Sequence, residues 1–240
     1  MKQHILATYG TAIAALALFL FFCAAADNFV NPTNLLNVGK QVSFLAILAI
    51  GFSIAFTVAE LDLSFAAVCS LCAVVAGGLV FKKVEPVLAV LAAVGVGVAA
   101  GLVNGMLVTR LRIPSLIATL AMASVATGTA CAITGGVAFA GRWDPAFLAL
   151  GRGSVLGIPT LILWTAAVAL VALFVLKQTR LGMHLVFTGE AEEAARLAGV
   201  KVRRMKVLAL AFAGLCAGLV GTLLAATLNS AAPTWRRITS

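Results

Sequence analysis

Two acidic residues, Glu60 and Asp62, lie in the most apolar part of the chain, between runs long enough to enter a bilayer. Acids at membrane depth are costly, so they usually face a protein interior, a cavity or an interface and mark a functional position. The alternative is a tight turn at the membrane surface, where both carboxylates are hydrated. Asn104, in another apolar run, can hydrogen-bond across helices or contact a polar solute in a pore. These residue types suit contact with a polar solute.

Residue patterns for catalysis or metal binding are missing from the sequence. His4 and His184 are far apart, no glycine-rich loop precedes Lys-Ser or Lys-Thr, and no Ser, His and Asp are placed to cooperate. Cys69 and Cys72 form the only close cysteine pair, without the histidine or second pair that a metal site needs. We therefore expect a protein that is not an enzyme, with no catalytic residue, no metal and no cofactor.

Composition places the chain among membrane proteins. Hydrophobic residues make up 62% of the 240 residues and charged residues 10%, whereas about a quarter of a soluble domain is charged. We predict an all-α, polytopic helical membrane protein with a single transmembrane domain over residues 1–240. About seven transmembrane helices are expected. Their approximate ranges are 8–26, 43–59, 63–81, 87–109, 115–134, 158–176 and 207–228.

The first apolar run, TAIAALALFLFFCAAAD, has two interpretations. It is either a signal-peptide core with Ala24 and Ala26 at a cleavage site, or a first span that extends back through Thr8. In both cases the chain emerges on the outer side. The following Asn31-Pro32-Thr33 predicts a helix break, and residues 34–42 predict a short interfacial segment before the second span.

Residues 177–206, KQTRLGMHLVFTGEAEEAARLAGVKVRRMK, form the one long polar stretch. It holds ten of the chain's 25 charged residues, and seven of these ten are basic. Basic residues in a short loop between two spans mark the cytoplasmic side, so the N-terminus is expected there too. The net charge of +9 is spread over loop ends without a basic face interleaved with aromatics, so we expect no nucleic-acid partner.

A short helix is predicted inside this polar stretch. Thr188 or Gly189 can start it and Gly199 can stop it. Its first turns place three acids at the positive end of the helix dipole: Glu190, Glu192 and Glu193. The simpler interpretation is an ordinary solvated surface helix, and the sharper one is a helix that docks on a partner protein.

Two features of this predicted helix bear on docking. Glu192 and Arg196 have the i,i+4 spacing of a surface ion pair. Small residues form a stripe on another face, which can lie close in a groove of a partner. The stripe consists of Ala191, Ala194, Ala195 and Ala198.

Other segments give simpler expectations. Glycines at four-residue spacing in one span, and a similar set in the last span, predict faces for close helix packing. These glycines are Gly97, Gly101 and Gly105, and Gly214, Gly218 and Gly221. Residues 135–157 predict a loop without strong periodicity, which either meets a solute-binding protein on the outer face or is simply solvated.

Several motifs resemble one family. GEAEEAARLAGVKVRRMKV resembles the cytoplasmic loop of permease subunits of bacterial ABC importers of the ribose, xylose and galactose type. AELDLSFAAV resembles that family's Gly-Gly-Ile-Asp-Leu-Ser-Val-Gly signature, in which Asp62, Leu63 and Ser64 match. Ala59 and Glu60 depart from it. Residues 110–114, RLRIP, keep the family's order of a basic pair followed by Ile-Pro. The resemblance extends over about residues 30–230.

This resemblance implies the function and the site. It implies a permease domain of the bacterial inner membrane that passes a sugar or similar small polar solute by alternating access. Its partners would be an ATP-binding ABC subunit, an extracytoplasmic solute-binding protein, a second permease copy or a homologue, and the lipid bilayer. Residues 177–206 become the cytoplasmic coupling loop, with ATPase-coupling residues Glu190, Glu192, Glu193, Ala194, Ala195, Arg196 and Gly199. The possible translocation path includes Asp62, Ser64 and Asn104.

Two alternatives stay open. A permease for branched-chain amino acids belongs to a related class with the same helix break and loop. The family also continues beyond a Pro-Thr like Pro233-Thr234 with further membrane helices, so the chain resembles about the first two-thirds of a longer permease bundle. On that interpretation it is a truncated, inactive remnant or a membrane scaffold.

Overall fold

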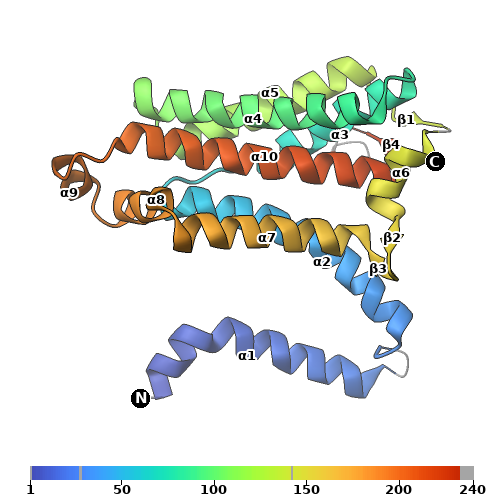
Figure 1. Ribbon diagram of the computed structural model, residues 1–240, viewed down its shortest axis with the longest axis horizontal. Coiled ribbons are helices and arrows are strands. Elements are labelled where there is room, and N and C mark those ends of the chain that lie inside the picture. Colours follow the sequence, from blue (N-terminus) through green and yellow to red (C-terminus); the bar gives the residue numbers. More distant parts are fainter. Residues whose placement is uncertain (1, 27–28, 142, 233–240) are drawn as a thin grey trace. The chain divides into compact units, whose positions relative to one another are not determined.

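A computed structural model describes residues 2–26, 29–141 and 143–232 (Figure 1). The chain divides into two compact units, residues 1–42 and 43–240. The described residues form ten α-helices and four strands of two residues each, which confirms the all-α class. Pro233-Thr234 and the residues after them, on which the expectation of truncation depends, lie outside the described residues.

The first unit contains α1 (Lys2–Ala25) and the start of α2 (Pro32–Thr57). The side chain of Asn31 accepts a hydrogen bond from the Thr33 N–H at 3.0 Å, and Pro32 occupies the first helical position, where no backbone donor is needed. The predicted separate interfacial segment at 34–42 is therefore wrong. Proline starts this helix, which continues without a break to Thr57.

Apolar helices match all seven predicted spans. Among the described residues, five helices are long and apolar enough to cross a membrane, and two shorter apolar segments, Gly10–Ala25 and α3, add to them. The five are α2, α4 (Pro86–Arg110), α5 (Ser115–Thr134), α7 (Thr160–Gln178) and α10 (Val202–Leu228). Helix α3 covers Phe65–Phe81.

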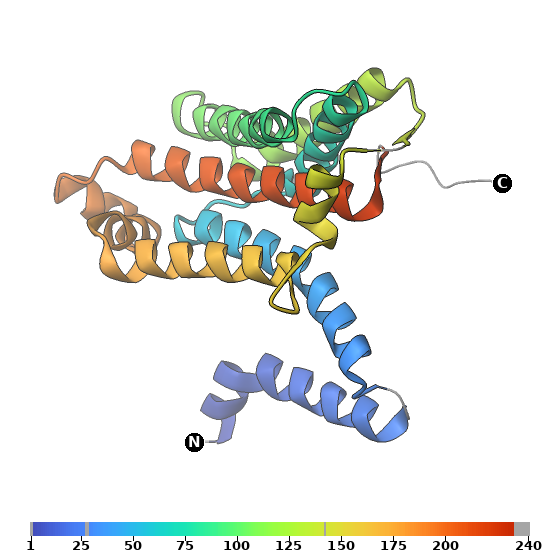
Figure 2. The same ribbon diagram turned by 45° about the vertical axis from the view of Figure 1, so that its right-hand side comes forward.

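Helix α10 is the central helix of the second unit. It packs along α4 and α3 and also contacts α6 (Pro145–Arg152) and α8 (Arg180–Glu190). Figure 2 shows it in the middle of the helices of this unit. Much of α10 is buried, whereas the other long apolar helices keep most of their surface exposed. Helices that are apolar all round and little covered by protein are typical of lipid contact.

Glycines let α4 and α10 approach closely, as predicted. A methyl group at Gly97 would meet the carbonyl oxygen of Gly214, and one at Gly101 would meet the carbonyl oxygen of Leu210. Gly221 on α10 instead faces the backbone of Cys69 in α3. Backbone contact of this kind replaces the hydrophobic effect, which does not drive helix association within lipid.

The connection between α5 and α7 is more regular than predicted. It contains α6 (Pro145–Arg152), whose first turn is capped by the Asp144 side chain accepting from the Ala146 N–H at 2.8 Å. Strand β1 (Phe139–Ala140) pairs with β4 (Ser230–Ala231), and β2 (Ser154–Val155) pairs with β3 (Ile158–Pro159). The expectation of an irregular loop over 135–157 is therefore wrong. The sequence did contain a signal for this helix, because Asp followed by Pro, here Asp144-Pro145, is typical of a helix start.

We expect Gly97→Ala to lower the free energy of unfolding by about 1–3 kcal/mol, because the new methyl group meets the α10 backbone, which cannot yield cheaply. Gly95→Ala is the matched control on the same helix, because no atom lies within 4 Å of a methyl group there. Unfolding in mixed micelles titrated with sodium dodecyl sulfate measures both. Equal stability of the two variants would contradict close packing of α4 on α10.

Candidate functional site

Residues 58–64 connect α2 to α3 and are here called the 58–64 connection. Helix α2 ends at Thr57, and Ala59 has a φ of 58°. A glycine adopts this left-handed conformation freely, whereas an alanine there costs about 1–2 kcal/mol. The chain therefore turns sharply at this point although the glycine pair of the related signature is absent.

Asp62, Ser64 and Asn104 form one hydrogen-bonded chain. The Asp62 Oδ1 accepts from the Ser64 N–H at 2.8 Å and from the Ser64 hydroxyl at 2.6 Å. The Asn104 Nδ2 donates to the Ser64 Oγ at 3.0 Å. All three residues are buried, and the Asn104 Oδ1 has no hydrogen-bond partner among the described residues. The structure thus brings together the three residues expected in the translocation path, and it buries them from solvent.

Hydroxyl groups at the start of α5 hold the backbone of the 58–64 connection. The Leu61 N–H donates to the Ser115 Oγ, and the Leu63 N–H donates to the Thr119 Oγ1, both at 3.2 Å. The Thr119 hydroxyl also donates to the Ser115 carbonyl oxygen one turn back, at 2.8 Å. The sequence did not reveal that the same hydroxyl serves the 58–64 connection.

Two helices, not one, occupy the predicted coupling segment. Helix α8 (Arg180–Glu190) is followed by Ala191, whose φ of −151° and ψ of 77° break the helix, and α9 (Glu192–Leu197) comes next. Thr188 is no helix start, because its hydroxyl donates to the His184 carbonyl oxygen at 2.7 Å inside α8. The predicted start at Thr188 or Gly189 is therefore wrong.

The two ends of α9 test the predicted acidic first turn and the predicted stop at Gly199. Glu190 is the last residue of α8, so only Glu192 and Glu193 lie in the first turn of α9. The predicted place of Glu190 at the positive end of the helix dipole is therefore wrong. Gly199 follows α9 with a φ of 83°, which confirms it as the helix stop.

The predicted stripe of small residues is only partly accessible. Ala195 is completely buried, whereas Ala191, Ala194 and Ala198 are exposed. The side chain of Leu197, which sequence reasoning overlooked, is 84% exposed. Leu197 is the one large apolar residue of α9, whose other residues are charged or alanine. This difference in residue type is the feature of the sequence that could have identified it.

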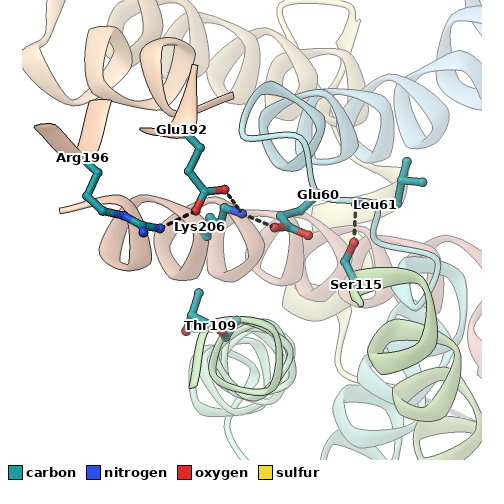
Figure 3. Close-up of polar contacts among 8 residues, drawn as sticks. Glu60, Leu61, Thr109, Ser115, Glu192, Arg196 and Lys206 are labelled. Carbon is teal, nitrogen blue, oxygen red and sulfur yellow. Dashed lines mark hydrogen bonds and ion pairs between the residues drawn. The ribbon is translucent and has the colours of Figure 1, made fainter. Parts of the chain in front are cut away.

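An unbroken chain of ion pairs joins α9 to the 58–64 connection (Figure 3). The Arg196 Nη2 lies 3.0 Å from the Glu192 Oε1, which confirms the predicted i,i+4 pair. The Lys206 Nζ lies 2.8 Å from the Glu192 Oε2 and 2.8 Å from the Glu60 Oε1. The Glu60 side chain is only 8% exposed. The alternative of two hydrated acids in a surface turn is therefore wrong, because Asp62 is buried as well.

A basic groove lies beside these ion pairs. Its volume is about 780 Å³, and the ends of α4 and α9 and the start of α10 border it. The cationic side chains that line it are Arg112, Arg196, Lys201, Arg203, Arg204 and Lys206, whereas Glu192 is the one acid among the lining residues. Such a surface attracts an anionic partner.

Comparisons with known proteins agree on a class of membrane transport protein. Residues 34–239 match the family model described as the permease component of a branched-chain amino acid transport system. The chain is 34% identical over 226 residues to the ribose import permease protein of Escherichia coli strain K12, covering 92% of this chain and 70% of that protein. No solved structure matches the chain.

Two further relatives are equally similar. The ribose import permease protein of Bacillus subtilis strain 168 is 34% identical over 209 residues, which are 86% of this chain and 65% of that protein. The L-arabinose ABC transporter permease protein of Azospirillum brasilense is 34% identical over 225 residues, which are 93% of this chain and 66% of that protein.

The hydrogen bond from Lys206, followed by the charges of Lys206 and Arg196, keeps the pKa of Glu192 below its ordinary value of 4.5, against the opposing effect of partial burial. A lowered pKa means that the pair stabilises the folded state above pH 4.5 and that this stabilisation is lost as the pH falls through the lowered value. We therefore expect Glu192→Gln to reduce stability at neutral pH, on the order of 0.5–1 kcal/mol, as for exposed pairs.

Unfolding of the parent chain and of Glu192→Gln at a series of pH values measures this difference, which should shrink below pH 4.5. Glu85→Gln is the control, because Glu85 is an exposed residue whose side chain does not cap α4. A loss of stability that is the same at every pH would contradict the ionic contact.

Proposed function

The chain belongs to the family of permease components of branched-chain amino acid transport systems, and from this premise we propose that it is the membrane-spanning subunit of an ATP-driven sugar importer. The family is one of transport permeases, not of enzymes, and its members together with the apolar helices place the chain in the inner membrane as a multi-pass protein. The proposed cargo is a sugar or a similar small polar solute.

Sugar is favoured over a branched-chain amino acid by the relatives. The three described above are permeases for ribose or L-arabinose, although the family model carries the name of amino acid transport. The Asp62, Ser64 and Asn104 chain supports a polar cargo, because the Asn104 Oδ1 can accept a hydrogen bond from a hydroxyl group. In the present conformation these three hydrogen-bonded residues are buried from solvent, as expected when a translocation path is closed.

The observation that carries the proposal is the exposure of α9. This helix lies outside the long apolar helices, beside the basic groove, and turns Leu197 outward. We propose that residues 177–206 are a cytoplasmic coupling loop on which the ATP-binding subunit docks, through Glu190, Glu192, Glu193, Ala194, Arg196 and Gly199 and also through Leu197. Ala195, which the sequence also suggested, is completely buried and supports this surface from beneath. An isolated apolar side chain on a polar segment gains free energy when a partner covers it.

The remaining parts of the proposal concern orientation and other partners. The excess of basic residues in 177–206 supports a cytoplasmic side for α9 and for the N-terminus. The connection with α6 would then lie outside and meet the extracytoplasmic solute-binding protein. A second permease copy or a homologue is a further proposed partner. The chain corresponds to about 70% of the length of the ribose permease of Escherichia coli strain K12.

We expect Leu197→Asp to lower the amount of ATP-binding subunit that co-purifies with the chain about tenfold or more, because a central apolar contact becomes a buried charge. Leu156→Asp is the matched control, since Leu156 is 97% exposed in the β2–β3 turn, away from α9. Co-expression, affinity purification and quantitative blotting measure the association. Equal amounts of the ATP-binding subunit with both variants would overturn docking on α9.

Transport itself is tested in cells that express the chain with its ATP-binding and solute-binding partners. We expect ATP-dependent uptake of labelled ribose or L-arabinose, and no uptake of labelled leucine, because hydroxyl groups suit the Asn104 acceptor. Uptake of leucine without sugar would support the amino acid alternative. No uptake of either class would support an inactive remnant or a scaffold.

A further inference from the structure

The Glu60 and Lys206 pair is placed where an ion pair is a poor way to gain stability. The Glu60 side chain is 8% exposed and the Lys206 side chain 16%, and their charged atoms lie 2.8 Å apart. Removing two charges from water costs about as much as their attraction returns, so apolar residues would often serve stability equally well. What a buried ion pair supplies instead is a defined position for the two segments that carry it.

One ammonium group holds two segments at once. Lys206 contacts Glu60 in the 58–64 connection and Glu192 in α9, each at 2.8 Å. An ammonium has three donors that can point to different carboxylates, so both contacts persist together. Any displacement of α9 therefore changes the force on Lys206 and, through it, on Glu60.

Apolar packing supports the same link. Val58 of the 58–64 connection packs in one cluster with Leu185 of α8 and Met205, which precedes Lys206 on α10. The backbone of Gly189 in α8 approaches the Thr57 carbonyl oxygen so closely that a methyl group at Gly189 would collide with it. The coupling segment and the end of α2 are thus also in direct contact through packing, in addition to the ion pair.

The 58–64 connection contains Asp62 and Ser64, two of the three residues of the buried hydrogen-bonded chain. Asp62 lies two residues from Glu60, and side-chain hydroxyl groups of Ser115 and Thr119 hold the neighbouring amides of Leu61 and Leu63. Such bonds to rotatable hydroxyl groups exchange more readily than the bonds within a helix. A pull on Glu60 can therefore move Asp62 without unwinding α2 or α3.

We infer that Glu60 and Lys206 are positioning residues for transport: the pair passes the movement of α9 to the 58–64 connection and thereby to Asp62, Ser64 and Asn104. This inference rests on the proposed function, because it requires an ATP-binding subunit that moves α9. Glu60 departs from the related family signature, so the role inferred for it is specific to the sequence of this chain. In this role the pair acts through the residues that it positions.

The test compares transport with ATP hydrolysis in proteoliposomes that contain the whole importer complex. We expect Glu60→Gln and Lys206→Gln each to lower the solute transported per ATP hydrolysed about tenfold, while the co-purified ATP-binding subunit stays within about twofold of the parent. The variant with both substitutions should be no worse than Lys206→Gln alone, because each substitution removes the contact between Glu60 and Lys206. Lys206→Arg keeps the positive charge and should therefore retain most of the solute transported per ATP hydrolysed. Lys82→Gln, an exposed lysine outside this cluster, should leave the ratio unchanged.

Four results would overturn the inference. A normal ratio in Glu60→Gln and Lys206→Gln would do so, as would effects that multiply in the double variant. If the single variants do not accumulate in the membrane, the Glu60→Met and Lys206→Met double variant replaces them, since it leaves no unpaired buried charge. Its low ratio would support the inference, and a normal ratio would overturn it. Failure of the unsubstituted complex to bind the ATP-binding subunit or to transport would overturn the proposed function, and this inference with it.

Discussion

The contact on which the site depends is that of the Lys206 ammonium with two carboxylates from distant parts of the chain. Glu192 belongs to a short helix outside the apolar bundle, and Glu60 belongs to the turn between two apolar helices. A single charge thus joins an exposed surface to a buried polar chain. Because the interior contact is poorly hydrated, its geometry constrains the two segments more strongly than an exposed ion pair would.

A rigid helix pair makes this contact useful. Lys206 lies near the start of α10, which the glycines Gly97, Gly101 and Gly214 bring into backbone contact with α4. Asn104, on the same α4, reaches the Ser64 hydroxyl. The α4 and α10 pair therefore carries both ends of the link, and displacement of α9 or of the 58–64 connection takes place against a fixed reference.

Sequence patterns predicted the parts of this arrangement that depend on local chemistry. Hydropathy located seven apolar helices, glycine spacing identified the packing faces, and the spacing of Glu192 and Arg196 predicted their pair. The break at Ala191 escaped, because the nearest glycine, Gly189, lies inside α8 and not at the break. The contact between Glu60 and Lys206 escaped because tertiary packing alone brings residues so far apart in sequence together. Family resemblance pointed to Asp62 and Ser64, but not to Glu60.

The most direct measurement is a pair of electron cryo-microscopy structures of the assembled importer, one without nucleotide and one with ATP bound. We expect α9 and residues 58–64 to move together relative to the α4 and α10 pair, with Lys206 in contact with Glu60 in both states. Displacement of α9 while the 58–64 connection and its contacts with Ser115 and Thr119 stay in place would contradict a mechanical link between the coupling surface and the buried polar chain.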